Sequence, residues 1–341
     1  MATNALLPST IPEEWETWIS ENKMQDLGDE KIVQILVANG LDEPLARDAV
    51  RRFDPYDPSQ RAGRRLAQRL QKLESVLNSL QAMASLDPTF GCVPRVKELT
   101  REEFLRCYYS ANRPVVITDV MKRWSAPTRW TPEYLKSKCG HVIVEVMTGR
   151  DVDPAYEINM EQHKNKMLFG DFVDRVFSGE CTNDCYMTGN NHFLENPEVQ
   201  CLLDDIEVCS QYLEPEVPGF SFFWFGPGGT VTKPHHDELN ILMAQVLGQK
   251  KITLVSPSES HLVYNNLGVY SDVDWDVPDY DSYPLFKKVH RIEVTLNPGE
   301  MLFIPVGWWH YVKGVKPSLT ISFSNFVFPN EFQYRDPEIR D

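Results

Sequence analysis

The chain has 341 residues, of which 42% are hydrophobic, enough for one sizeable domain and a smaller region beside it. Its formal net charge of −15 at pH 7 opposes phosphate groups, which argues against nucleic acid and anionic membranes as partners. The sequence shows neither a signal peptide nor a run of about 18 apolar residues, so we expect a soluble, cytoplasmic protein without a membrane segment.

The N-terminal part of the chain reads as a series of helices. A first helix is expected after Pro12, and a second runs from the N-cap residue Asp29 to the stop signal Asn39-Gly40. A third helix is expected over 45–53. The segment 54–60, DPYDPSQ, then predicts a turn.

A longer helix with a heptad pattern follows this turn. Its apolar residues recur at alternating steps of four and three: Leu66, Leu70, Leu73, Leu77, Leu80 and Ala84. Such a seam packs against another helix or surface. Two interpretations stay open, namely packing on the rest of the same chain and a contact between two copies in a homodimer.

Beyond residue 90 the pattern changes to short β-branched and aromatic runs separated by turn residues. Eight of them predict strands: 114–120, 142–147, 220–226, 241–248, 251–257, 291–296, 301–306 and 319–328. We therefore expect an α-helical region over 1–90 and a mainly β domain over 91–341. The expected architecture is a double-stranded β-helix, the jelly roll or cupin, with surrounding helices.

The acidic segment SDVDWDVPDYDSY, residues 271–283, lies between two predicted strands. Its charges predict a long solvated loop. The alternative is a lip that attracts a basic substrate, because clustered carboxylates favour cationic partners.

The stretch PHHDEL places two histidines before an acidic pair. Side chains two residues apart point to the same side of a strand, so His235 and Asp237 share one face while His236 points to the other. A third ligand has to come from a distant part of the chain, and His310 follows the apolar run PGEMLFIPVGWW. Two histidines and one carboxylate are the facial ligand set of non-haem Fe(II) oxygenases.

Two long motifs carry a resemblance to a known family. They are GPGGTVTKPHHDELNILMAQVLGQKKITLVSP and PGEMLFIPVGWWHYV, and the likeness extends from about residue 94 to about residue 328. The chain resembles the jumonji-C, or cupin-like, branch of the 2-oxoglutarate dioxygenases. It is most similar to the small protein hydroxylases typified by the asparaginyl hydroxylase that inhibits hypoxia-inducible factor. The resemblance implies Fe(II), 2-oxoglutarate and dioxygen as cofactor and co-substrates, with His235, Asp237 and His310 as catalytic iron ligands.

The resemblance also implies a set of 2-oxoglutarate contacts. Lys250, thirteen residues after Asp237, matches the lysine that pairs with the distal carboxylate of the co-substrate, and its neighbour Lys251 should face away. The other contacts implied are the hydroxyls of Thr232 and Tyr186 on the same carboxylate, and Asn325 near the metal-binding end of the co-substrate.

The function implied is hydroxylation of a side chain in a protein or peptide, with release of succinate and CO2. Departures from the closest family pattern at Ile241 and Val327 leave the substrate open. The alternatives are an N-methyl-lysine demethylase, a tailoring hydroxylase for a small molecule or amino acid, and a cupin that binds without catalysis.

Overall fold

The protein is described by a computed structural model, which divides into two compact units, Met1–Ala82 and Met83–Asp341. The residues that it describes are 11–24, 27–53, 58–215, 221–266 and 268–332. The division lies eight residues before the boundary that we expected at 90, inside the long helix. In the described residues, no helix has both the length and the apolar character that a membrane crossing requires.

The N-terminal unit consists of helices. They are α1 (Glu13–Met24), α2 (Asp29–Ala38), α3 (Glu43–Arg52) and α4 (Pro58–Ala84). The first three bury a small apolar core that includes Ile19, Ile32 and Leu36, and α4 adds no residue to it. The turn predicted over 54–60 lies outside the described residues at 54–57. Its remainder, 58–60, was predicted wrongly, because it forms the start of α4, where proline fits a first helical turn.

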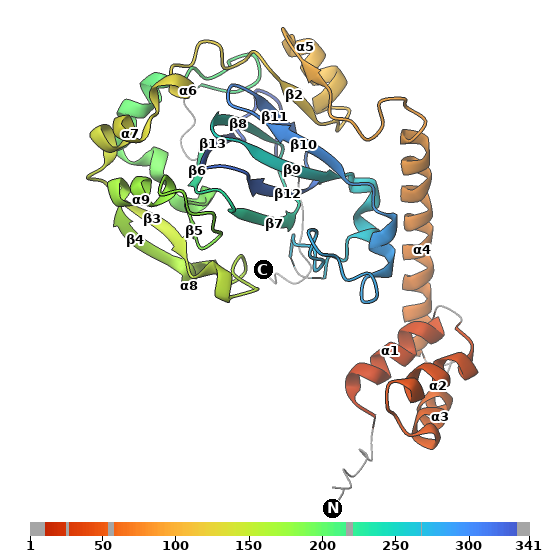
Figure 1. Cartoon of the computed structure of the whole chain (residues 1–341). Helices are drawn as coiled ribbons and strands as arrows, with labels where there is room; N and C mark the ends of the chain where they lie inside the picture. Colours follow the sequence, from red (N-terminus) through yellow and green to blue (C-terminus); the bar gives the residue numbers. More distant parts are fainter. Residues whose placement is uncertain (1–10, 25–26, 54–57, 216–220, 267, 333–341) are drawn as a thin grey trace, which may run out of the picture. The chain divides into compact units, whose positions relative to one another are not determined.

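The second unit is built around two β-sheets (Figure 1). In spatial order the larger sheet contains β1 (Arg95–Val96), β2 (Val115–Ile117), β11 (Met301–Ile304), β8 (Ile241–Leu247), β13 (Ser318–Phe323) and β6 (Ser221–Gly226). The smaller sheet contains β10 (Ile292–Leu296), β9 (Lys250–Val255), β12 (Trp309–Gly314) and β7 (Val231–His235). All neighbours in these sheets are antiparallel except β1 and β2, which confirms the predicted jelly-roll fold.

Further helices and a third sheet surround this core. The helices are α5 (Arg101–Phe104), α6 (Ala126–Arg129), α7 (Pro132–Cys139), α8 (Met160–His163) and α9 (Phe169–Val176). The third sheet contains β4 (Lys164–Leu168), β3 (Ile143–Thr148) and β5 (Cys185–Tyr186). Each of the eight predicted runs contains a strand, whereas β7 and β12 had not been predicted as strands, because polar and aromatic residues interrupt their apolar pattern.

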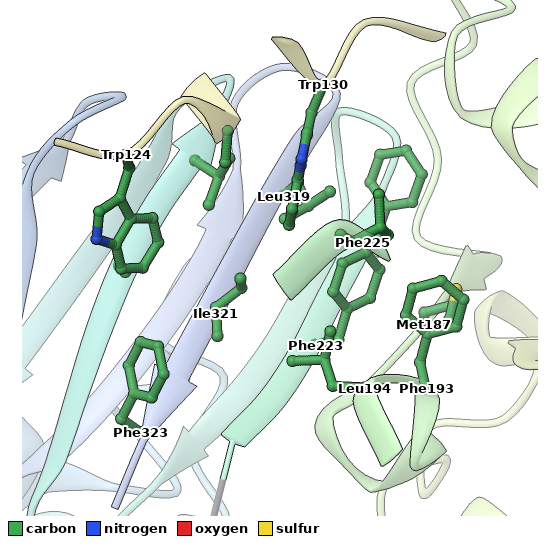
Figure 2. Packing of buried hydrophobic residues seen from close by; sticks show 14 of the residues in the cluster. Trp124, Trp130, Met187, Phe193, Leu194, Phe223, Phe225, Leu319, Ile321 and Phe323 are labelled. Carbon is green, nitrogen blue, oxygen red and sulfur yellow. The ribbon is translucent and has the colours of Figure 1, made fainter. Parts of the chain in front are cut away.

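Alternation along the larger sheet separates two apolar layers. The odd-numbered residues of β6 and β13 face outward, where Phe223, Phe225 and Ile321 pack against residues such as Trp124 and Trp130 (Figure 2). The other face of the larger sheet meets the smaller sheet in a second cluster. To this cluster β8 and β11 of the larger sheet contribute Met243 and Leu302, and β9 and β12 of the smaller sheet contribute Ile252, Leu254 and Val312. The space between the two sheets is therefore apolar at one end, and it holds the polar site described below at the other.

The acidic segment 271–283 has no helix or strand and its carboxylates are exposed, as expected, but some of the residues between them are buried. Val273 and Trp275 are buried in a cluster with Trp309. Asp276 accepts a hydrogen bond from the Tyr311 hydroxyl at 2.7 Å. The apolar residues between the acidic ones thus fix this loop on the outer side of the smaller sheet.

Asp205 is a buried acceptor that joins the chain at α6 and α7 to the segment that precedes the sheets. It ends the 3-10 helix η5 (Pro197–Asp205) and is 1% exposed. Its carboxylate accepts hydrogen bonds from the Ser125 hydroxyl at 2.6 Å, the Tyr134 hydroxyl at 2.7 Å and the Trp130 indole at 2.9 Å, and it pairs with Arg129. Four donors from one neighbouring segment therefore depend on one carboxylate.

We expect Asp205→Ala to lower the free energy of unfolding by about 3 kcal/mol, because buried donors would lose their common acceptor. Urea denaturation followed by tryptophan fluorescence measures the change. The matched control is Asp204→Ala, whose side chain is exposed, with an expected change within about 0.5 kcal/mol. Equal losses in the two variants would contradict this role.

Candidate active site

A β-bulge in β7 brings the candidate ligands to one side of the smaller sheet. β7 pairs with β12 so that His235 lies opposite His310 and Thr232 lies opposite Val312, which leaves one extra residue in β7 between the two pairs. Residues three apart would face opposite sides of a regular strand, and the bulge cancels this alternation. Pro234 lies in the bulge of this edge strand, a position where a missing N–H is tolerated.

His235, Asp237 and His310 converge on one point. The Nε2 atom of His235 lies 3.7 Å from Oδ1 of Asp237, and Nε2 of His310 lies 3.5 Å from Oδ2. One donor atom of each residue lies within 4.8 Å of the others, and the described part of the chain contains no second such group of His, Cys, Asp or Glu. The three residues proposed as ligands from the sequence are thus brought together by β7, the turn after it and β12.

The protonation of the two rings suits a metal ion. The Nδ1 atom of His235 lies 2.8 Å from the Lys233 carbonyl, and that of His310 lies 3.0 Å from the Trp308 carbonyl. A carbonyl accepts only from an N–H, so each Nε2 keeps its lone pair for a metal. Burial lowers the pKa of His310 to about 4, which keeps this ring neutral at pH 7. Two imidazoles and one carboxylate fit Fe(II) with coordination positions left open.

His236 takes the other direction. Its ring packs edge-on against Trp309, with ring centres 4.8 Å apart and planes at 71°. Burial lowers the pKa of its imidazole. It lies beside two ligands in the sequence but turns toward an aromatic neighbour on β12, as the alternation of strand side chains predicts.

The buried amine of Lys250 favours an anionic ligand in this site. It is 1% exposed, and its Nζ donates a hydrogen bond to the Tyr186 hydroxyl at 3.1 Å. Burial alone lowers the pKa of this amine to about 7, and no carboxylate of the described residues pairs with it. A buried cation without a counter-ion is costly, so the site favours a ligand that supplies a carboxylate. Lys251, by contrast, is exposed and pairs with Glu293 at 2.8 Å.

The turn before β9 determines where Lys250 enters the pocket. Gly248 connects β8 in one sheet to β9 in the other with a φ of +66°. A Cβ atom at this position would lie 2.0 Å from the Pro317 carbonyl oxygen. Only glycine combines this backbone conformation with this close approach, so the glycine allows the chain to cross between sheets two residues before the buried lysine.

One cavity of about 580 Å³ contains six of the seven predicted site residues. They are Tyr186, Thr232, His235, Asp237, Lys250 and His310. The seventh, Asn325, follows the end of β13 and does not line the cavity. Its side chain donates a hydrogen bond to the Glu214 carbonyl instead. The amide group of Asn325 is therefore directed away from the cavity.

Several residues that line the cavity were not predicted from the sequence. Trp224 and Ser322 face inward because they alternate with outward-facing aromatic and aliphatic residues, so the period of two in their strands could have revealed them. Tyr270 also lines the cavity, and burial raises the pKa of its hydroxyl. It lies in a loop between strands, where no periodicity could have predicted its direction.

Arg150 supports the tyrosine beside Lys250. Its side chain is buried, and its guanidinium lies 5.2 Å from the ring centre of Tyr186. It donates to the Val231 carbonyl at 2.8 Å and to Glu157 at 3.1 Å. This arrangement connects β7 to the Tyr186 ring and holds the hydroxyl toward the lysine. The sequence offered no signal for it, since a single arginine after a glycine is common.

Comparisons with known proteins agree with this geometry. The cupin-like domain family matches residues 100–333. The chain is 29% identical over 237 residues to lysine-specific demethylase 8 of Xenopus tropicalis. The matched region covers 68% of this chain and 52% of the relative. It is 32% identical over 247 residues to lysine-specific demethylase JMJ30 of Arabidopsis thaliana, covering 66% of this chain and 52% of the relative. The chain thus spans about half the length of these two relatives.

A further relative has a different printed activity. The chain is 28% identical over 235 residues to tRNA wybutosine-synthesizing protein 5 of Gallus gallus, covering 64% of this chain and 72% of the relative. Proteins similar to this chain therefore carry names that refer to lysine-specific demethylation and to the synthesis of wybutosine in tRNA.

We expect His310→Ala to weaken Mn(II) binding at least about a hundredfold. The loss of one of three ligands exceeds the ten- to hundredfold cost of losing a hydrogen bond that supports a ligand. Isothermal titration with Mn(II), which resists oxidation, measures the affinity. The matched control is His236→Ala, which should bind Mn(II) as the unaltered protein does, because the His236 ring packs on Trp309. Equal effects of the two substitutions would contradict the ligand assignment.

We expect Lys250→Met to raise the free energy of unfolding at pH 7 by roughly 2 to 4 kcal/mol, since it removes a buried cation without a counter-ion. The pKa of Lys250 is lower in the folded state than in the unfolded state, so the unfolded state binds more protons between pH 7 and 10.5. The stability of the unaltered protein should therefore rise over this range, and the advantage of Lys250→Met should shrink.

Urea denaturation of both proteins at pH 7 and pH 9.5 measures this difference. The matched control is Lys251→Met, at the neighbouring exposed position, where we expect a change within about 0.5 kcal/mol at either pH. An advantage of Lys250→Met that stays constant with pH would contradict the role of the buried charge.

Proposed function

The chain belongs to the cupin-like, or jumonji-C, family of Fe(II)- and 2-oxoglutarate-dependent oxygenases, and from this membership we propose that it hydroxylates a side chain of a protein or peptide. The observation that carries the proposal is the pairing of two incomplete sites in one cavity. A set of three metal ligands and a buried lysine without a counter-ion both face the same space. A keto acid with a second carboxylate satisfies both at once.

The residues of this chain would divide the work as follows. His235, Asp237 and His310 would hold Fe(II), and Lys250 with the hydroxyls of Tyr186 and Thr232 would bind the distal carboxylate of 2-oxoglutarate. When bound, these groups supply the oxidising chemistry, which consumes dioxygen and releases succinate and CO2. The protein contributes position, because the selectivity of the reaction depends on which C–H bond is held near the metal.

Lys250 would become fully protonated when the co-substrate binds. Burial lowers the pKa of this amine to about 7, so close to half of it is neutral at pH 7 before a ligand binds. A carboxylate beside the amine stabilises the protonated form. The cavity should therefore take up a proton as it binds 2-oxoglutarate, and affinity should decrease as the pH rises above 7.

The charge of the chain supports a protein or peptide substrate over tRNA. Binding of a nucleic acid relies on lysine and arginine side chains that neutralise phosphates, whereas this chain has 49 acidic and 34 basic residues. Its net charge of −15 would repel a polyanion. A neutral or basic peptide segment fits this surface better.

The second candidate is an N-methyl-lysine demethylase. The names of the demethylase relatives favour it, as do two carboxylates that line the cavity, Glu157 and Glu238, since a methylated ammonium group is cationic. In this case hydroxylation of the methyl carbon would be followed by loss of formaldehyde. A small-molecule substrate has no specific observation in its favour beyond the size of the cavity.

The deciding experiment measures both the co-substrate and the product. We expect the protein to form succinate from 2-oxoglutarate with Fe(II) and ascorbate, and His310→Ala to lower the rate at least about a hundredfold. Mass spectrometry of unmodified and N-methylated peptide libraries then identifies the product. A gain of one oxygen supports hydroxylation, whereas loss of methyl groups supports the demethylase. An absence of succinate under all conditions would favour a cupin that only binds.

A further inference from the structure

Helix α4 carries an apolar face that remains exposed. None of its 27 residues is buried. Four leucines of its heptad seam are exposed, 62% at Leu66, 56% at Leu70 and Leu73, and 46% at Leu80, while Leu77 is half-buried. Helices α1 to α3 pack around a core of their own to which α4 contributes no side chain. Exposed apolar side chains in one continuous row are typical of a surface that is covered by a partner.

The spacing of the row indicates a coiled-coil partner. If Leu66 is placed at position d of a heptad, Leu73 and Leu80 also occupy d, while Leu70 and Leu77 occupy a. The seam extends to Ala84 and spans about 27 Å of helix. A seam with this period is the contact surface of two helices that wind around each other. A flat protein surface does not require this period.

The charges beside the seam are complementary to a second copy of the same helix. Among positions e and g over 66–84, the charged residues are Arg69 at g and Glu74 at e. In a parallel pair, position g of one helix meets position e five residues later on its partner. Residue 69 plus five is residue 74, so each Arg69 meets Glu74 of the other copy, twice by symmetry. An antiparallel pair places g beside g and e beside e, and offers no such contact.

The other basic side chains of α4 do not conflict with this arrangement. Arg61, Arg64, Arg65 and Lys72 occupy positions f, b, c and c. These positions point away from the seam of a two-stranded coiled coil. These basic residues therefore do not meet the seam of the pair.

We propose that α4 forms a parallel, two-stranded coiled coil with α4 of a second copy, so that the protein is a homodimer joined through its N-terminal unit. A parallel pair has two-fold symmetry, in which the same face of each copy meets its equal. The inference concerns the N-terminal unit alone and does not depend on the chemistry of the cavity.

The first test is the mass of the full chain in solution by light scattering over a range of concentrations. We expect twice the monomer mass for the unaltered protein. We expect the monomer mass for a Leu70→Ser, Leu77→Ser variant at micromolar concentration. Unchanged Mn(II) binding and circular dichroism of the catalytic unit would show that the variant is folded. A monomer or a higher oligomer of the unaltered protein would overturn the proposal.

The second test exchanges the charges. Arg69→Glu and Glu74→Arg should each raise the dissociation constant of the dimer about tenfold, because each change sets like charges against each other at two places. The variant that combines both substitutions restores opposite charges and should return to within about threefold of the unaltered value. Failure of the combined variant to recover would exclude the parallel arrangement.

The third test reports orientation directly. In a parallel pair, residue 70 of one copy lies beside residue 70 of the other, so Leu70→Cys should form a linked dimer under mild oxidation. Ser75→Cys, at position f on the outer side, is the matched control and should remain unlinked beyond the background of the unaltered protein. Equal linking of the two variants, or no linking of Leu70→Cys, would overturn the proposed register.

Discussion

The burial of the Lys250 amine is the constraint on which the candidate active site of the second unit depends. Its side chain is 1% exposed, and no carboxylate of the described chain pairs with it. A protein that only needed stability would place an apolar residue at this position. On the proposed function, a keto acid would supply the missing charge when it binds. On this interpretation, the buried amine lowers the stability of the ligand-free protein and gives selectivity toward a dicarboxylate. Tyr186 contacts the amine, and Arg150 packs on the Tyr186 ring.

The bulge in β7 determines how Thr232 and the candidate metal ligand His235 face relative to each other. Without the extra residue, Thr232 and His235 would face opposite sides of the smaller sheet, and the two halves of the site would separate. With it, β7 places both Thr232 and His235 in the cavity that Lys250 also lines, while β12 adds His310. Backbone hydrogen bonds between two adjacent strands thus fix the positions of Thr232, His235 and His310 relative to one another.

The cavity and the exposed seam of α4 lie in different units of the chain. Within the second unit, one apolar layer joins the larger sheet to its helices and another lies between the sheets, so this unit has the core that a folded domain needs. The first unit has a small core among α1 to α3 and an exposed seam on α4. A seam of this kind can be changed without disturbing the cavity. Association through α4 and turnover in the cavity are therefore separate properties that experiments can vary independently.

Much of this protein could be predicted from the sequence because its signals are local or periodic. Strand runs such as 241–248, the stop at Asn39-Gly40 and the heptads of α4 depend on near neighbours, and the long motifs around His235 and His310 predicted the ligand set. The tertiary structure alone decided what depends on contacts between distant strands. It revealed that a bulge aligns Thr232 with His235, that Arg150 supports Tyr186, and that Asn325 turns toward Glu214 and away from the cavity. Strand pairing and burial arise from residues far apart in the chain, so no local pattern encodes them.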